Sequence, residues 1–157
     1  LMKTAQEWFD AYGVSHQNKT NKLIHWVCIP LIMFSLFGLL MSIPVPGGNF
    51  SLFFNFASLV LAFALVFYFR LSLTLFFGFL VIGLTMIFGN YYLLGALGSQ
   101  GALALVSIAL FVIAWIGQFI GHKIEGAKPS FFEDLQFLMI GPAWLLQFIY
   151  KKIGLSI

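Results

Sequence analysis

The stretch from Leu23 to Gly121 carries a single formal charge, Arg70, and this feature limits the folds that the chain can adopt. Soluble domains average about 25% charged residues, whereas this chain of 157 residues is 8% charged and 61% hydrophobic. A charge-poor stretch of this length is typical of several membrane-spanning helices. The sequence therefore predicts an all-α integral membrane protein, with residues 1–157 forming a single membrane domain.

Turn signals divide the charge-poor stretch into four predicted transmembrane helices. Proline and glycine mark a turn at residues 44–48, and a second break precedes residue 101. A turn near Arg70 is also required, because residues 51–94 are too many for one crossing. The predicted spans are residues 24–43, 51–69, 71–94 and 101–120. Each suits a hydrocarbon core of about 30 Å, which needs roughly 17–25 residues.

Two further segments are predicted to lie at the membrane surface. Residues 3–22 mix aromatic and charged side chains, which favours an amphipathic interfacial helix interrupted at Gly13, and no cleavable signal peptide is expected there. Residues 135–150 are apolar but short, with charges at both ends and a break at Gly141 and Pro142. This pattern favours a re-entrant or interfacial helical hairpin rather than a fifth crossing.

The basic residues predict the orientation. With four spans every lysine and arginine falls on one side of the membrane, which is cytoplasmic by the positive-inside rule. Both termini are then cytoplasmic. A bacterial inner membrane is favoured over the endoplasmic reticulum, because Lys151 and Lys152 lie too far from Ile157 to form a dilysine retrieval signal. Nucleic-acid binding is not expected, since the basic residues are few and scattered.

The three histidines, His16, His25 and His122, lie where the charge-poor stretch begins and ends. If the first and last spans are neighbours, the three imidazoles can converge on one face of the membrane. Neutral imidazole is the commonest side-chain ligand of zinc and iron, and three nitrogens leave coordination positions open. The histidines are thus candidate metal ligands. Spacing alone also allows the plainer interpretation that each is an amphipathic interface residue.

Polar neighbours extend this candidate site. Asn21, Gln118 and Glu125 each share a helix face with a histidine and are candidate acceptors for an imidazole N–H. Gln118 is predicted to be an outer-shell residue, which contacts a ligand and not the metal. Glu125 is predicted to be either an outer-shell residue or a direct metal ligand. Lys22 and Lys123, with Asn21, are candidate substrate-binding residues, the lysines as a clamp for a carboxylate. The simpler interpretation of the lysines is interfacial snorkelling.

Five segments together resemble the membrane-bound 2-hydroxy fatty acid dioxygenases, the family of a fungal enzyme of phytosphingosine breakdown. They are residues 12–16 (YGVSH), 18–25 (NKTNKLIH), 29–31 (IPL), 118–125 (QFIGHKIE) and 128–130 (KPS). The resemblance extends over nearly the whole chain in motif order and number of spans. The two longer motifs are specific as a pair and weak singly.

The resemblance implies an Fe²⁺-dependent enzyme of lipid metabolism and sphingolipid degradation. It would convert a long-chain 2-hydroxy fatty acid and O₂ into a fatty acid one carbon shorter plus CO₂. His16, His25 and His122 match the histidine positions of the family and would be the iron ligands and the catalytic centre. The implied partners are the 2-hydroxy acid, O₂ and the lipid bilayer, with no indication of oligomeric state.

Two other functions remain open at this point. One is a different metal-dependent lipid enzyme, such as a zinc hydrolase built on the same three histidines. The other is a non-enzymatic four-helix membrane protein whose histidines are incidental. A proton-coupled transporter is disfavoured, because no acidic residue or lysine lies deep in a predicted span.

Overall fold

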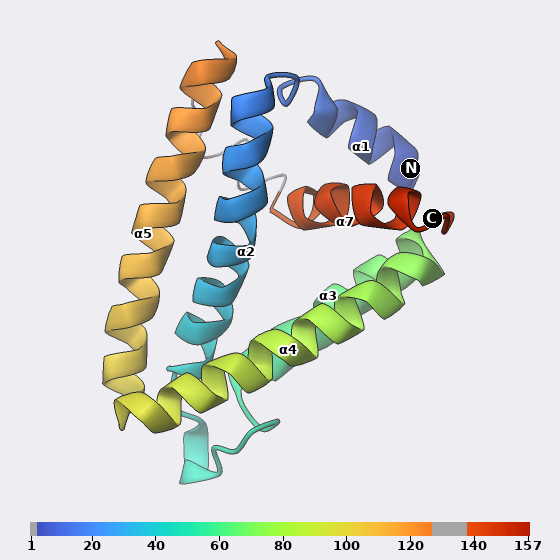
Figure 1. Ribbon diagram of the computed structural model, residues 1–157. Coiled ribbons are helices and arrows are strands. Elements are labelled where there is room, and N and C mark those ends of the chain that lie inside the picture. Colours follow the sequence, from blue (N-terminus) through green and yellow to red (C-terminus); the bar gives the residue numbers. More distant parts are fainter. Residues whose placement is uncertain (1–2, 127–137) are drawn as a thin grey trace.

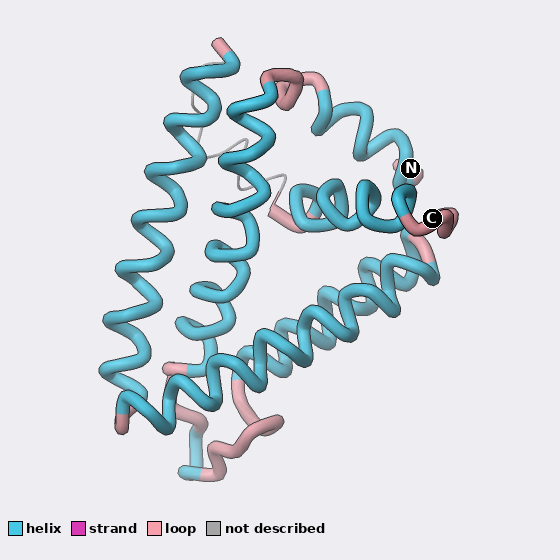
Figure 2. The backbone as a smooth tube through the Cα atoms, in the orientation of Figure 1, coloured by secondary structure: helices cyan, strands magenta, loops and turns pink. Residues whose placement is uncertain are grey.

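The computed structural model describes residues 3–126 and 138–157, and within these ranges the chain is all-helical (Figure 1). This confirms the predicted class. Among the connections that the structure describes, Figure 2 shows short loops and a longer segment between α2 and α3 that includes the 3₁₀ turn Pro46–Gly48. The α-helices are α1 (Ala5–Gly13), α2 (Lys19–Met41), α3 (Phe56–Leu71), α4 (Leu73–Leu97), α5 (Gln100–Glu125) and α7 (Ile140–Lys152).

Three of the described helices, α2, α4 and α5, are long and apolar enough to cross a membrane. The remaining expected span, residues 51–69, is shorter as a helix, because α3 has 16 residues and begins at Phe56 instead of residue 51. Asn55 explains this start. Its side-chain oxygen accepts a hydrogen bond from the backbone N–H of Ser58, which caps the helix at that point. Ser72 separates α3 from α4, so a break does lie beside Arg70.

The helices pack as two antiparallel pairs. α2 lies mainly against α5, and α3 lies mainly against α4. In Figure 1 the α3–α4 pair starts near the lower ends of α2 and α5 and runs diagonally away from them, so that the two pairs form the sides of a wedge. The helices α1 and α7 occupy the wide end of this wedge. The amino-terminal end of α2 and the carboxy-terminal end of α5 therefore lie side by side, which is the condition under which the histidines converge.

The helix α7 fills the wide end of this wedge, and its shape corrects one expectation. The predicted break at Gly141 and Pro142 was wrong, because both residues lie in the first turn of a continuous helix. Proline is tolerated there, since the first backbone N–H groups of a helix have no intrahelical acceptor. Residues 135–137 of the predicted hairpin lie outside the described residues.

Tyrosine hydroxyls join α7 to the α3–α4 pair. Tyr68 donates a hydrogen bond of 2.6 Å to the carbonyl of Met139, just before α7, and Tyr150 donates one of 2.7 Å to the carbonyl of Thr74. A buried apolar cluster of α1, α2, α3, α4 and α7 residues surrounds these bonds. The segment that closes the wedge is thus held by packing and by two hydrogen bonds to backbone carbonyls.

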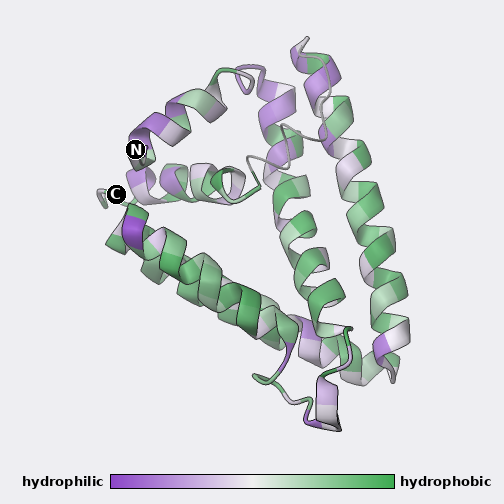
Figure 3. Ribbon diagram, turned by 180° about the vertical axis from the view of Figure 1, so that it is seen from behind, coloured by the Kyte–Doolittle hydropathy of each residue, from purple (hydrophilic) through white to green (hydrophobic). Residues whose placement is uncertain are grey.

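Polar residues gather at one end of the molecule. Figure 3 shows hydrophobic colouring along the middle of α2, α3, α4 and α5, with hydrophilic colouring on α1 and at the adjoining ends of α2 and α5. The three histidines belong to this polar end. A metal site at this end would lie at the boundary between polar side chains and the apolar interior of the helices.

Candidate metal centre

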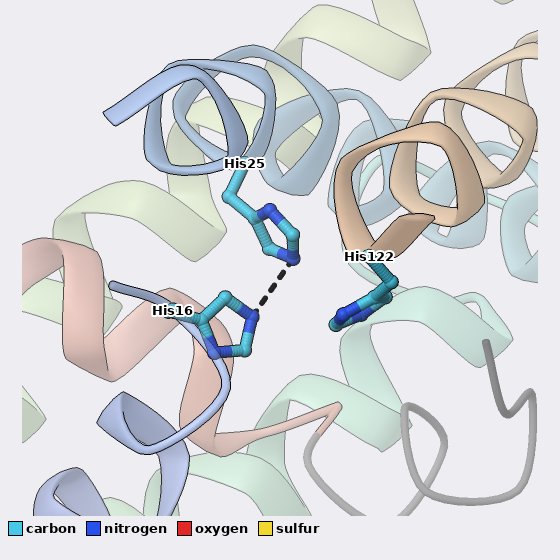
Figure 4. Close-up of side chains that lie close together, drawn as sticks. All are labelled: His16, His25 and His122. Carbon is cyan, nitrogen blue, oxygen red and sulfur yellow. Dashed lines mark hydrogen bonds between the residues drawn. The ribbon is translucent and has the colours of Figure 1, made fainter. Parts of the chain in front are cut away.

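The three histidines form one buried cluster in the structure. One ring nitrogen from each of His16, His25 and His122 lies within 4.8 Å of the other two, a separation at which three groups can hold one metal ion. All three side chains are buried, with at most 5% of their surface exposed. Figure 4 shows the rings pointing toward one another from three different parts of the chain. We call this the histidine cluster.

Close packing of α2 on α5 brings two of the three rings together. His25 lies in the second turn of α2, and His122 lies in the last turn of α5. Glycine permits the approach: a methyl group on Gly121 would lie 2.4 Å from the side-chain oxygen of Asn21, and one on Gly117 would lie 2.5 Å from the sulfur of Cys28. Small residues at helix contacts are the usual route to close packing in membranes.

Backbone carbonyls determine which ring nitrogen of His16 and His25 faces the cluster. Nδ1 of His16 lies 2.6 Å from the carbonyl oxygen of Tyr12, and Nδ1 of His25 lies 2.9 Å from that of Asn21. Because a carbonyl oxygen only accepts, each Nδ1 carries the proton and donates it. In a neutral ring the other nitrogen, Nε2, then presents a lone pair, which is the form that binds metals.

The two lone pairs face each other. Nε2 of His16 lies 2.9 Å from Nε2 of His25, although neither nitrogen carries a proton in the neutral forms just described. Burial lowers the pKa of His16 to about 4, so this ring is neutral at pH 7. A metal cation bound between the two rings would be coordinated by both lone pairs. With metal–nitrogen distances of about 2.1 Å, ligand nitrogens in adjacent positions lie roughly 3.0–3.4 Å apart, which the observed distance approaches.

Glu125 holds the segment that carries His16. Its carboxylate accepts hydrogen bonds of 2.7 Å from the backbone N–H groups of Gln17 and Asn18 and one of 3.0 Å from the side-chain amide of Asn21. These donors surround the amino-terminal end of α2, where negative charge is favourable. In this structure the carboxylate therefore binds the α1–α2 segment, and a direct role as metal ligand has no support from its contacts.

The other predicted site residues differ in how far their side chains are buried. Asn21 is fully buried and bridges Glu125 and the carbonyl of Ser15. Gln118 is also buried, and its Oε1 atom has no hydrogen-bond partner. Lys22 is half-buried and Lys123 is exposed. The substrate-binding roles of Lys22, Lys123 and Asn21, and the outer-shell roles of Glu125 and Gln118, stay predictions.

Two aromatic residues at the site had no predicted role. The ring of Tyr12 stacks on that of His16 at 4.0 Å between centroids, and Trp144 of α7 lies 5.3 Å from His16. Tyr12 falls within the YGVSH segment and so carried a signal, although the motif does not say what it contacts. Trp144 lies far along the chain, and only the docking of α7 brings it to His16.

Comparison with known proteins gives one family. A family model described as 2-hydroxy-palmitic acid dioxygenase Mpo1-like matches residues 2–153. A comparison with curated proteins and a comparison with solved structures found no match.

Proposed function

The chain belongs to the Mpo1-like family of 2-hydroxy-palmitic acid dioxygenases, and on this premise we propose that it is an Fe²⁺-dependent dioxygenase of 2-hydroxy fatty acids. The reaction takes a long-chain 2-hydroxy fatty acid and O₂ to a fatty acid one carbon shorter, CO₂ and water. Bound ferrous iron would supply the one-electron chemistry by which O₂ reacts with an organic acid. His16, His25 and His122 would hold the metal.

One observation carries the proposal: three buried imidazoles converge, and two of them have their metal-binding nitrogen selected by backbone carbonyls. Incidental interface histidines would have no reason to share this arrangement. Three ligands from one side leave other coordination positions open, as in non-haem Fe²⁺ oxygenases. The burial of the cluster by Tyr12 and Trp144 would limit access of water to the reacting groups.

The chain's own residues would orient the substrate. The cluster lies at the polar end of α2 and α5, so that a carboxylate can stay near water while an acyl chain extends into the apolar interior. Lys22 and Lys123 flank the cluster in sequence, and we propose that they attract the carboxylate of the 2-hydroxy acid. Asn21 would act through its hydrogen bonds to the segment that carries His16.

We further propose four membrane crossings, with both termini cytoplasmic and in a bacterial inner membrane. The start of α4 contacts the carboxy-terminal segment, because Tyr150 bonds to the carbonyl of Thr74 and the Thr74 hydroxyl bonds to that of Ser156. Arg70 and the carboxy-terminal lysines thus share one end of the molecule. A 16-residue α3 is about 24 Å long at 1.5 Å per residue, so its crossing would need local thinning of the bilayer.

The test is a mass-spectrometric assay of the purified protein in detergent with 2-hydroxypalmitic acid, Fe²⁺ and air. We expect a product one carbon shorter that is absent without O₂ and absent in His122→Ala. Metal analysis of the same samples should find iron in the wild type and none in His25→Ala or His122→Ala. Full turnover without iron would refute the proposal, and turnover with zinc but without O₂ would indicate a hydrolase.

A further inference from the structure

A large apolar groove lies between α2 and the α3–α4 pair. Its volume is about 640 Å³, which falls within the range of about 300–1,000 Å³ typical of small-molecule sites. Met33 and Leu40 line it from α2, Ala64 from α3 and Phe79 from α4, and Pro142 of α7 lines its wide end. The lining holds no charged side chain among the described residues. We call this space the wedge groove.

A small cavity lies beside the wedge groove and is lined in part by residues about one helical turn from the histidines in sequence. This cavity, of about 20 Å³, has room for about one water molecule. It is lined by Tyr12, Ile29 and Gln118, each four residues from a different histidine of the cluster. The residues that line both spaces are Met33, Leu138 and Pro142. The wedge groove therefore adjoins the small cavity, which approaches the histidine cluster through Tyr12, Ile29 and Gln118.

We propose, on the basis of the function proposed above, that the wedge groove holds the acyl chain of the 2-hydroxy acid. The chain would run from beside Gln118 past Met33 and Pro142 and lie between α2 and α3, and the cavity at Gln118, which now has room for about one water molecule, would widen to admit it. The Gln118 side chain lines the small cavity, and its Oε1 atom is buried and has no hydrogen-bond partner in the structure. The 2-hydroxyl group of the substrate could donate a hydrogen bond to this Oε1 atom.

The length of the groove fits one acyl chain. Along α2 and the two residues that follow it, the lining runs from Met33 to Ile43, which corresponds to about 15 Å at 1.5 Å per residue. Half of a bilayer core of about 30 Å has nearly the same depth. The far end opens toward lipid at Ile43 and Val60, which are 43% and 44% exposed.

Selection among substrates by acyl-chain length would come from how well the chain fits the wedge groove, and not from the free energy of moving the chain out of water. A substrate that arrives from the bilayer already has its chain in an apolar medium, so its burial in the groove gains little solvation free energy. A side chain that blocks the groove would instead exclude chains long enough to reach it. Ala64 lines the groove from α3, whereas Ala62 on the same helix is exposed.

The experiment compares Ala64→Phe with Ala62→Phe as the matched control. Both variants add the same side chain to α3, but only the first fills the groove. We expect Ala64→Phe to lower turnover of long-chain relative to short-chain 2-hydroxy acids by at least about tenfold, as for a misfitting group in an apolar pocket. Ser42→Phe, at the far end, should affect only the longest chains. Ala62→Phe should match the wild type.

A second measurement reports on binding without turnover. A palmitic acid carrying a photoreactive diazirine at mid-chain is irradiated with the protein in lipid nanodiscs, and labelled peptides are mapped by mass spectrometry. We expect labelling of α2 and α3 at the wedge groove that unlabelled 2-hydroxypalmitic acid competes away. Ala64→Phe should lose this labelling and Ala62→Phe should keep it.

The outcomes separate the two proposals. Equal chain-length profiles and equal labelling in the two alanine variants would overturn the groove assignment. Labelling that 2-hydroxypalmitic acid does not compete away would overturn it as well, since the groove would then hold bulk lipid. If the wild type converts no 2-hydroxy acid but the competed labelling depends on Ala64, the groove assignment stands and the proposed reaction fails.

Discussion

The carboxylate of Glu125 accepts a 2.7 Å hydrogen bond from the backbone N–H of Asn18, which joins the last residue of α5 to the residue that caps α2. The segment held in this way carries His16, and α5 itself carries His122. One side chain therefore sets the spacing between two members of the histidine cluster. It does so without contacting the position that a metal would occupy.

Glu125→Gln should weaken metal binding and leave the fold intact. The amide would place an N–H₂ group against backbone donors, which loosens the His16 segment. Outer-shell substitutions typically lower metal affinity by about 10–100-fold, and we expect a loss in this range in a titration with Fe²⁺ or Zn²⁺. The cost to stability should be about 1 kcal/mol, given the partial exposure of the carboxylate.

Glu7→Gln provides the control for this change. Glu7 forms a capping box with Thr4 in α1, and glutamine fills the same role in such boxes. The metal affinity of the Glu7→Gln variant should equal that of the wild type. An unaltered metal affinity in Glu125→Gln would show that the hydrogen bonds of the Glu125 carboxylate do not position His16.

Metal should stabilise the folded protein through the histidine cluster. At a free metal concentration about 100-fold above the Kd, the free energy of unfolding should rise by about 2.7 kcal/mol. Denaturation monitored by circular dichroism, with and without a chelator, measures this difference. His122→Ala should fold and show no stabilisation by metal. Equal stabilisation in that variant would place the metal elsewhere.

Gly121→Ala should disturb the contact between α2 and α5. The new methyl group would meet the Asn21 side-chain oxygen at 2.4 Å, and Asn21 cannot turn away freely because its amide is bonded to Ser15 and Glu125. Overpacking of this kind costs about 1–3 kcal/mol, and the separation of His25 from His122 should lower metal affinity as well.

Gly101→Ala is the matched control on the same helix. A methyl group there meets no atom within 4 Å, so alanine should be neutral or should stabilise the protein by up to about 1 kcal/mol. Thermal unfolding of both variants in detergent tests the contrast. If both behave alike, the close approach at Gly121 does not limit the packing of α2 on α5.

Tyr150→Phe should loosen α7. The substitution removes the hydrogen bond from the Tyr150 hydroxyl to the carbonyl of Thr74, at a cost of about 1 kcal/mol. Faster hydrogen exchange along α7 would report the effect. Tyr92→Phe is the control, because Tyr92 is 80% exposed on α4. Equal exchange in the two variants would mean that apolar packing alone holds α7.

Much of the site was predictable because its ligands are rare and its surroundings lack charge. The chain has only three histidines, so a metal site built from three imidazoles could use only His16, His25 and His122. The outer shell was less predictable. The acceptors for His16 and His25 are the backbone carbonyls of Tyr12 and Asn21, and every residue has a carbonyl, so no residue type marks this role in a sequence.

The helical class follows from the amino-acid sequence alone, because apolar side chains in long runs require backbone hydrogen bonds to close within each segment. The sequence also determined which residue types were available for metal chemistry. The way in which the helices meet became apparent only from the three-dimensional fold. The continuous helix through Pro142, the contact of Trp144 with His16 and the shape of the wedge groove all depend on packing between segments far apart in the chain. Such contacts arise from the complementary shapes of whole helices, which local sequence patterns do not encode.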